Sequence, residues 1–242
     1  MPELEVFPDE GQLIRTEAER IVVLASQAID ARGSCRIALS GGATPRPLYQ
    51  LLATPPYAAR IDWSRVHLFW GDERCLPPDD PDSNYRMTRE ALIDHVPVPP
   101  ENVHRIRGED EPQQAAESYE RVLRLFFGTE ERPARTFDLV LLGLGPDGHT
   151  ASLFPGTAAV IEARRWVMPV HVDWPRAMWR VTLTTVVLNA AADVTFLVAG
   201  GDKATRLREV LQEGAPLPAQ LVKPGPGKLH WMVDAAAGSA LR

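Results

Sequence analysis

Short apolar runs alternate with longer amphipathic stretches along almost the whole chain. Four of the runs carry at most one charged residue each and are followed directly by glycine or serine–glycine: residues 36–39, 66–70, 137–142 and 194–199. Such runs are typical of strands covered on both faces, as in a parallel sheet. Between them, apolar residues recur at the spacing of an amphipathic helix. The pattern therefore predicts strands and helices in alternation.

The same pattern places the individual elements. Helices are predicted over residues 9–33, 45–52, 83–95, 111–127, 184–192 and 203–211. Further strands are predicted over residues 4–7, 103–106, 166–170 and 178–183, with an edge strand over 229–233. Alternation of this kind indicates the α/β class, with a mostly parallel, doubly wound, Rossmann-like sheet and helices on both faces. We expect one such domain over residues 1–242.

Composition and charge narrow the possible partners. The formal net charge is −6, which argues against a nucleic-acid surface but not against a locally positive pocket for an anionic substrate. No apolar stretch is long enough to cross a bilayer, and the N-terminus lacks the features of a secretory signal. The two cysteines, Cys35 and Cys75, do not form a metal-spaced pair. We expect a cytoplasmic protein with reduced thiols and no membrane partner.

The strand over residues 36–39 leads into Ser40-Gly41-Gly42-Ala43-Thr44 and then into a helix that begins at Pro45. A glycine turn between a strand and a helix start exposes backbone N–H groups, and the helix dipole also favours an anion there. The segment is therefore a candidate phosphate-binding loop. It is not a Walker A loop, because no Gly-Lys-Ser/Thr follows. A plain turn with Thr44 near the helix start is an equally good interpretation of this segment alone.

Charged residues also follow the strand over residues 66–70. Asp72, Glu73 and Arg74 come directly after Gly71. The planar guanidinium of Arg74 suits a phosphate or a carboxylate, and Asp72 has the chemistry to orient a base or a substrate hydroxyl. The structural alternative is an internal Asp–Arg pair that stiffens the loop.

The strand over residues 137–142 ends in a loop with three glycines, from which Asp147 and His149 project. Open α/β sheets bind ligands just beyond the carboxyl ends of their strands. Lys203 lies at the start of a later helix, where an anionic ligand would balance its charge. Because parallel strands end on the same side of a sheet, we expect these loops to form one site. The alternatives are a capping Asp147, an ordinary loop histidine and a solvated Lys203.

Several common chemistries fit poorly. Residues 143–148 match the letters of a dinucleotide-binding fingerprint, but Pro155 comes too early for the long helix that this fingerprint opens. The histidines show no metal-ligand spacing, and no Gly-x-Ser-x-Gly elbow is present. A histidine base beside a carboxylate, with arginine, lysine and a glycine loop for a phosphate, suits proton transfer or water attack on a phosphorylated small molecule. We expect no metal and no cofactor.

Taken together and in order, these motifs resemble the 6-phosphogluconolactonase family. The resemblance rests on residues 38–45, 71–74, 82–84 and 143–155, with the segments around Arg180, Lys203 and His230-Trp231. The related glucosamine-6-phosphate deaminase family shares the sheet, the glycine loop and an Asp-Gly-His turn. In that family a glutamate stands at the position of Phe154 and a tyrosine at the position of Arg74. Both departures favour the lactonase.

The resemblance implies hydrolysis of 6-phospho-D-glucono-1,5-lactone, with His149 as the general base and either Asp147 or Asp72 orienting it. The substrate-binding residues that it implies are Ser40, Gly41, Gly42, Thr44, Arg74, Asn84, Arg180 and Lys203. The glycine loop, Arg180 and Lys203 are expected to bind the phosphate, and Arg74 to lie near the lactone or the phosphate. A deaminase-type enzyme and a non-catalytic phosphosugar-binding regulator are the alternatives. A monomer and a homodimer both fit the sequence.

Overall fold

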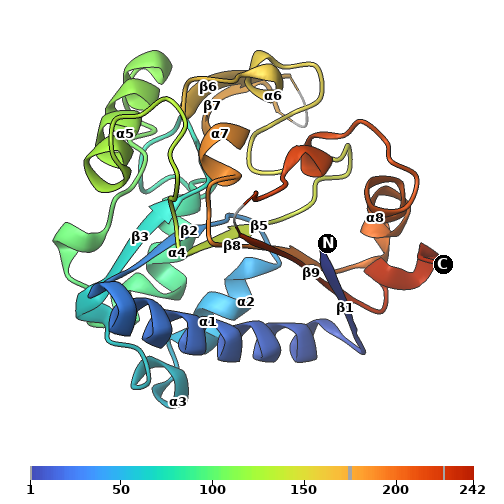
Figure 1. The fold of residues 1–242 in the computed structure, drawn as a ribbon, viewed down its shortest axis with the longest axis horizontal. Coiled ribbons are helices and arrows are strands. Elements are labelled where there is room, and N and C mark those ends of the chain that lie inside the picture. Colours follow the sequence, from blue (N-terminus) through green and yellow to red (C-terminus); the bar gives the residue numbers. More distant parts are fainter. Residues whose placement is uncertain (1, 174–175, 226) are drawn as a thin grey trace.

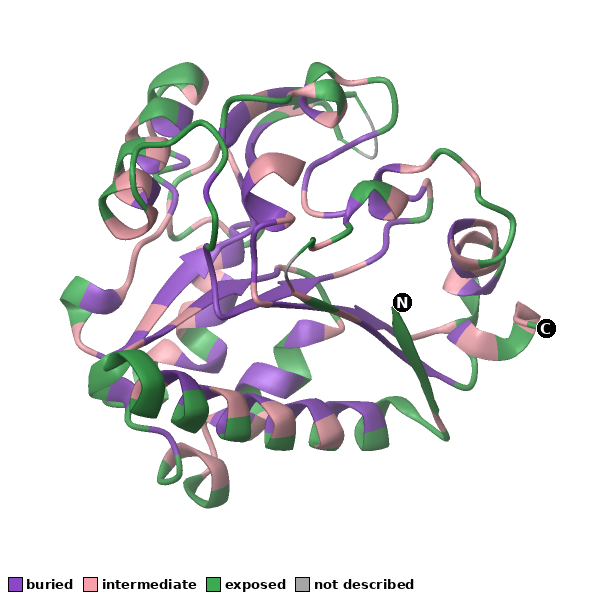
Figure 2. Cartoon of the chain, in the orientation of Figure 1, coloured by how far each residue is buried: buried purple, intermediate pink, exposed green. Residues whose placement is uncertain are grey.

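A six-stranded parallel sheet forms the centre of the computed structural model, which describes residues 2–173, 176–225 and 227–242 (Figure 1). In spatial order its strands are β1 (Glu3–Phe7), β9 (Lys228–Asp234), β8 (Asp193–Val198), β5 (Leu139–Leu142), β2 (Cys35–Leu39) and β3 (Val66–Trp70). Every neighbouring pair is parallel. The inner strands are buried and β1 is exposed (Figure 2). The predicted α/β fold class is confirmed.

The order of the strands contains one reversal. The chain runs from β2 outward to β3, then returns to β5 on the other side of β2 and continues to β8 and β9. The carboxyl ends of β2 and β5 therefore lie side by side while their following loops lead in opposite directions. Such a switch point opens a crevice in which doubly wound proteins bind ligands.

Helices cover both faces of this sheet. In Figure 1, α1 (Glu10–Arg32) and α2 (Pro45–Leu52) lie on one face, and α5 (Pro112–Phe127) and α7 (Thr185–Leu188) lie on the other. The remaining helices are α3 (Pro55–Ala58), α4 (Asn84–Ala91), α6 (Ala158–Ile161) and α8 (Ala204–Leu211). Helix starts follow the sequence signals: the Asp9 side chain caps α1 and the Ser83 side chain caps α4.

A second, antiparallel sheet was not predicted as a unit. In this small sheet β7 (Met178–Leu183) lies between β4 (Asp72–Arg74) and β6 (Val167–Val172). The sequence predicted strands near 166–170 and 178–183, but residues 72–74 were expected to form a loop. Their backbone instead pairs with β7, placing Arg74 opposite Arg180 and Asp72 opposite Thr182. Strand pairing thus overrides the low strand propensity of three charged residues.

Other predicted elements were wrong in detail. The strand at 229–233 is not an edge strand, because β9 pairs with both β1 and β8 and the exposed edge belongs to β1. Residues 103–106 form no strand beyond a single bridge between Leu68 and Val103. The helix expected to reach His95 ends at Ala91 and is followed by a short 3₁₀ turn. The helix expected to reach Ala192 ends at Leu188.

A buried acid lies near the amino ends of β8 and β9, at the end of the sheet opposite the crevice. Glu17, on α1, is fully buried and accepts a hydrogen bond from Arg20 at 3.0 Å. Asp193 and His230, at the amino ends of β8 and β9, also contact Arg20. Burial raises the pKa of Glu17 to about 8, outweighing the attraction of Arg20. The folded protein therefore keeps this carboxyl protonated at neutral pH.

This proton makes stability depend on pH. Between its ordinary pKa of 4.5 and about 8, Glu17 binds a proton in the folded state but releases it in the unfolded state, so the stability that it contributes is lost as pH rises. Glu17→Gln, which stays neutral, is expected to lose less stability than wild type between about pH 5 and about pH 8, as measured by urea unfolding at both values. Equal losses in the two proteins would contradict the assignment.

Candidate active site

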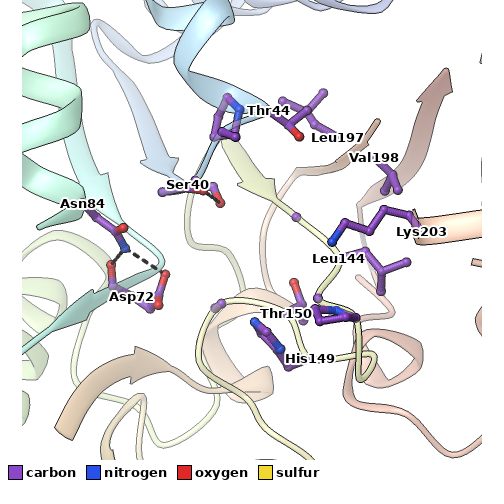
Figure 3. A pocket seen from close by; sticks show the side chains of 18 of the residues that line it. Ser40, Thr44, Asp72, Asn84, Leu144, His149, Thr150, Leu197, Val198 and Lys203 are labelled. Carbon is purple, nitrogen blue, oxygen red and sulfur yellow. Dashed lines mark hydrogen bonds between the residues drawn. The ribbon is translucent and has the colours of Figure 1, made fainter. Parts of the chain in front are cut away.

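A cavity of about 420 Å³ opens where β2, β3, β5 and β8 end (Figure 3). Of the site residues expected from the sequence, those that line it are Ser40, Gly41, Gly42, Thr44, Asp72, Arg74, Asn84, His149, Arg180 and Lys203. Asp147 does not line the cavity but contacts His149. The expectation that four separate loops meet at one place is therefore confirmed by the geometry.

The glycine loop, residues 40–44, forms one wall. The buried Tyr49 hydroxyl fixes its start by accepting from the Ser40 N–H at 2.9 Å and donating to the Ser40 carbonyl at 2.8 Å. Gly41 has no room for a side chain, because a Cβ there would lie 1.8 Å from Oδ1 of Asn84. Within the described part of the chain, the backbone N–H groups of residues 41–44 donate to no other protein group. They remain available to an anion at the start of α2.

Lys203 extends into the cavity from the side of β8 (Figure 3). It lies at the residue before α8, and its Nζ is 3.0 Å from Oδ2 of Asp202. The Asp202 side chain is mostly exposed, so this pair is a weak one. The Lys203 ammonium is thus free to turn toward an anion bound at the glycine loop.

The small sheet forms the opposite wall and carries two arginines. Arg74 donates from Nη1 to Oδ1 of Asn84 at 2.7 Å and to the Asp82 carbonyl at 2.6 Å. Asn84 in turn donates to the Asp72 carbonyl at 2.9 Å. The internal Asp72–Arg74 pair considered as an alternative is therefore not what orients Arg74.

Arg180 is a buried cation without an ion-pair partner among the described residues. Only 8% of the residue is exposed, and its Nε has no hydrogen-bond acceptor there. Burial lowers the pKa of this guanidinium. The attraction of nearby carboxylates, Asp72 first among them, offsets this effect only in part. An anionic ligand in the cavity would therefore be stabilised by Arg180.

His149 and Asp147 form a close pair. Nδ1 of His149 lies 2.5 Å from Oδ1 of Asp147, and the same oxygen accepts the His149 backbone N–H at 3.1 Å. Burial alone would raise the pKa of the Asp147 carboxyl, but the hydrogen bonds from His149 outweigh it and lower that pKa. The carboxylate beside the imidazole is thus Asp147 and not Asp72, whose oxygens accept from Asn84 and Ser152.

Glycine in the same loop allows this arrangement. The imidazole packs directly on Gly145, where a Cβ would lie 2.1 Å from Nδ1 of His149. Gly148 has a φ of 83°, a backbone conformation that favours glycine, and its N–H donates to the Gly145 carbonyl at 3.0 Å. The loop therefore closes on itself and turns His149 toward the cavity.

Three supporting residues were not predicted as part of the site. Glu73 is buried and accepts hydrogen bonds from the backbone of Arg74, Asn84 and Tyr85, which ties β4 to the start of α4. Burial raises the pKa of Glu73. Ser152 and Phe154 contact Asp72 and His149 respectively. All three fall within the motifs that carried the resemblance, but sequence spacing does not show what they touch.

A family model identifies the family of the chain. The model of glucosamine-6-phosphate isomerases/6-phosphogluconolactonase matches residues 8–231. The chain belongs to this family.

In the residues described, no group of three or more His, Cys, Asp or Glu side chains is arranged to hold a metal ion. Among the described residues, no helix has both the length and the apolar character needed to cross a membrane.

Two relatives that are 40% identical to the chain are 6-phosphogluconolactonases. That of Nostoc sp. is 40% identical and covers 98% of both chains, and that of Synechocystis sp. is 40% identical over 100% of this chain and 99% of the relative. The solved structure of 6-phosphogluconolactonase from Trypanosoma brucei superposes with a TM-score of 0.90 at 28% identity, over 100% and 99% of the two chains. A monomeric glucosamine-6-phosphate deaminase, at a TM-score of 0.82 and 19% identity, shares the fold.

Proposed function

We propose that the protein hydrolyses 6-phospho-D-glucono-1,5-lactone to 6-phospho-D-gluconate. The observation that carries this proposal is the placement of the His149–Asp147 pair and an anion-binding wall around one cavity. The membership of the family and the lactonase relatives support the same substrate. The proposed reaction uses no metal or cofactor and involves no nucleic acid or membrane. We propose that the enzyme acts in the cytoplasm.

His149 is assigned the role of general base. An ionised carboxylate only accepts hydrogen bonds, so Nδ1 of His149 donates to Asp147 and the lone pair of Nε2 is available to a water molecule. Nε2 takes a proton from that water as its oxygen bonds to C1 of the lactone. The proton then passes to the ring oxygen as the C1–oxygen bond breaks, which opens the ring. Histidine suits both transfers at neutral pH.

We assign the phosphate of the substrate to the glycine loop and the cations around it. Backbone N–H groups of the glycine loop, the Thr44 hydroxyl and the Lys203 ammonium would surround it, with Arg180 as a further cation. Arg74, held by Asn84, would contact the lactone or the phosphate. Backbone N–H groups at the strand ends would receive the oxyanion that forms at C1.

A hydrolysis assay with freshly prepared 6-phosphogluconolactone tests the proposal. The rate of 6-phosphogluconate formation is compared with the spontaneous rate, and glucosamine 6-phosphate is assayed in parallel for ammonia release. We expect acceleration with the lactone alone. Ammonia release would indicate a deaminase, and tight binding of 6-phosphogluconate without hydrolysis would indicate a regulator.

Lys203→Ala is expected to weaken binding of the phosphorylated substrate. Loss of one charge-assisted hydrogen bond would raise KM about 10- to 100-fold while leaving kcat close to wild type. Lys228→Ala is the matched control, because Lys228 is exposed at the amino end of β9, away from the cavity. An unchanged KM in Lys203→Ala would place the phosphate elsewhere.

A further inference from the structure

A tight turn brings two aromatic rings of the same segment together. Leu153 donates its N–H to the Thr150 carbonyl at 2.9 Å, so the chain folds back after His149. As a result Phe154 stacks on His149, with ring centroids 4.0 Å apart and an angle of 23° between the planes. The Phe154 ring covers one face of the imidazole, and Nδ1 at the edge of the imidazole contacts Asp147.

The turn that produces this stack is strained and anchored. Ala151 has a φ of 48°, the only positive φ of a residue other than glycine in the described chain. Such a conformation persists only where surrounding contacts enforce it, and it is found most often at functional sites. Here Ser152 supplies the contacts: its hydroxyl donates to Oδ2 of Asp72 at 2.5 Å and its N–H to the Thr182 hydroxyl at 3.1 Å. The position of Phe154 is therefore fixed from the small sheet.

The same ring also contacts Arg180. The guanidinium carbon lies 5.2 Å from the centroid of Phe154, within the range of a cation–π interaction. Phe154 is buried and thus gives Arg180 a favourable contact that carries no negative charge. This contact holds the cation without pairing it with an anion, so Arg180 stays available to a ligand in the cavity.

We propose that Phe154 is a positioning residue that orients the His149 imidazole and holds Arg180 without neutralising it. The proposal rests on the function assigned above and adds a residue that itself takes no part in proton transfer. An aliphatic side chain at this position would leave the imidazole free to tilt. A carboxylate would pair with Arg180 and remove that cation from the substrate.

Four variants separate these effects. Phe154→Tyr keeps the ring and is expected to retain kcat and KM within about twofold of wild type. Phe154→Leu removes the ring and is expected to lower kcat about 10- to 100-fold, as a misplaced catalytic group does. Phe154→Gln and Phe154→Glu have nearly the same shape but differ in charge. The glutamate variant is expected to show a KM about 10-fold above that of the glutamine variant, because its carboxylate pairs with Arg180.

The pH profile gives a readout that a purely structural role would not move. A carboxylate beside the imidazole favours its protonated form, so the acid limb of kcat/KM is expected to lie at higher pH in Phe154→Glu than in Phe154→Gln. Phe137→Leu makes the same truncation at a buried site outside the cavity, and it is expected to destabilise the protein without lowering kcat.

The outcomes are distinct from those of the proposed function. A wild-type protein that fails to accelerate lactone hydrolysis overturns the function. A wild-type protein that hydrolyses the lactone, with equal kcat in Phe154→Tyr and Phe154→Leu, overturns the role of the ring at His149. Equal KM values in the glutamate and glutamine variants overturn its role at Arg180, and equal acid limbs in these two variants overturn its contact with the His149 imidazole. If Phe154→Leu does not fold, the comparison of Phe154→Glu with Phe154→Gln still tests the proposal.

Discussion

His149→Ala is expected to lower kcat by about 10²- to 10⁴-fold, the usual contribution of a general acid–base group. The alanine variant can neither accept the proton of the attacking water nor return it to the ring oxygen. KM is expected to change much less, because the anion-binding groups lie on other walls of the cavity. Steady-state kinetics with fresh lactone, together with an unfolding curve, would measure both effects.

The chain offers a matched control for this experiment. His171 also lies two residues from an aspartate and contacts it, with 3.3 Å between Nδ1 and Oδ1 of Asp173, but it does not line the cavity. His171→Ala is therefore expected to retain wild-type kcat. A His149→Ala variant with near-wild-type turnover would remove His149 from the mechanism.

The sequence predicted the part of the site that depends on parallel strands. Apolar runs located β2, β3, β5 and β8, and the class of the sheet implied that the loops after them meet. Neither step needed side-chain detail, because the direction of parallel strands alone places their carboxyl ends on one side. Helix starts were also predictable where a local side chain caps them, as Ser83 caps α4.

The unpredicted part depends on contacts between residues far apart in the chain. Residues 72–74 form a strand only because β7 offers its edge, and β9 is an inner strand because β1, at the other end of the chain, pairs with it. Both arise from tertiary pairing, which overrides local pattern. Likewise the sequence left Asp147 and Asp72 equal as partners of His149. The distinction depends on Ser152 and Asn84, which engage Asp72.

Asp147 and Asp72 lie in different surroundings, so we expect them to have different roles. Asp147 touches the imidazole from behind and does not line the cavity, whereas Asp72 lines the cavity and organises the small sheet around it. Removing the charge of Asp147 should therefore act on proton transfer alone. Removing the charge of Asp72 should also disturb the Ser152 turn and the Asn84 side chain that orients Arg74.

Asp147→Asn is accordingly expected to lower kcat by about 10²-fold or more with little change in KM. The amide no longer stabilises the imidazolium that forms during water attack, and it no longer enforces donation from Nδ1. The acid limb of kcat/KM is expected to move to lower pH, because the neutral amide does not favour the protonated imidazole as a carboxylate does. A full pH profile of wild type and variant measures both changes.

Asp173→Asn is the control, since it removes the same charge from the His171 pair outside the cavity, and its profile is expected to match wild type. Asp72→Asn supplies the contrast. It is expected to raise KM as well as lower kcat, because the Asn84 side chain that accepts from Arg74 also donates to Oδ1 of Asp72 at 3.3 Å. If the acid limb moved in Asp72→Asn and stayed in place in Asp147→Asn, the carboxylate acting on His149 during turnover would be Asp72, and the pairing of Asp147 with the imidazole would be structural only.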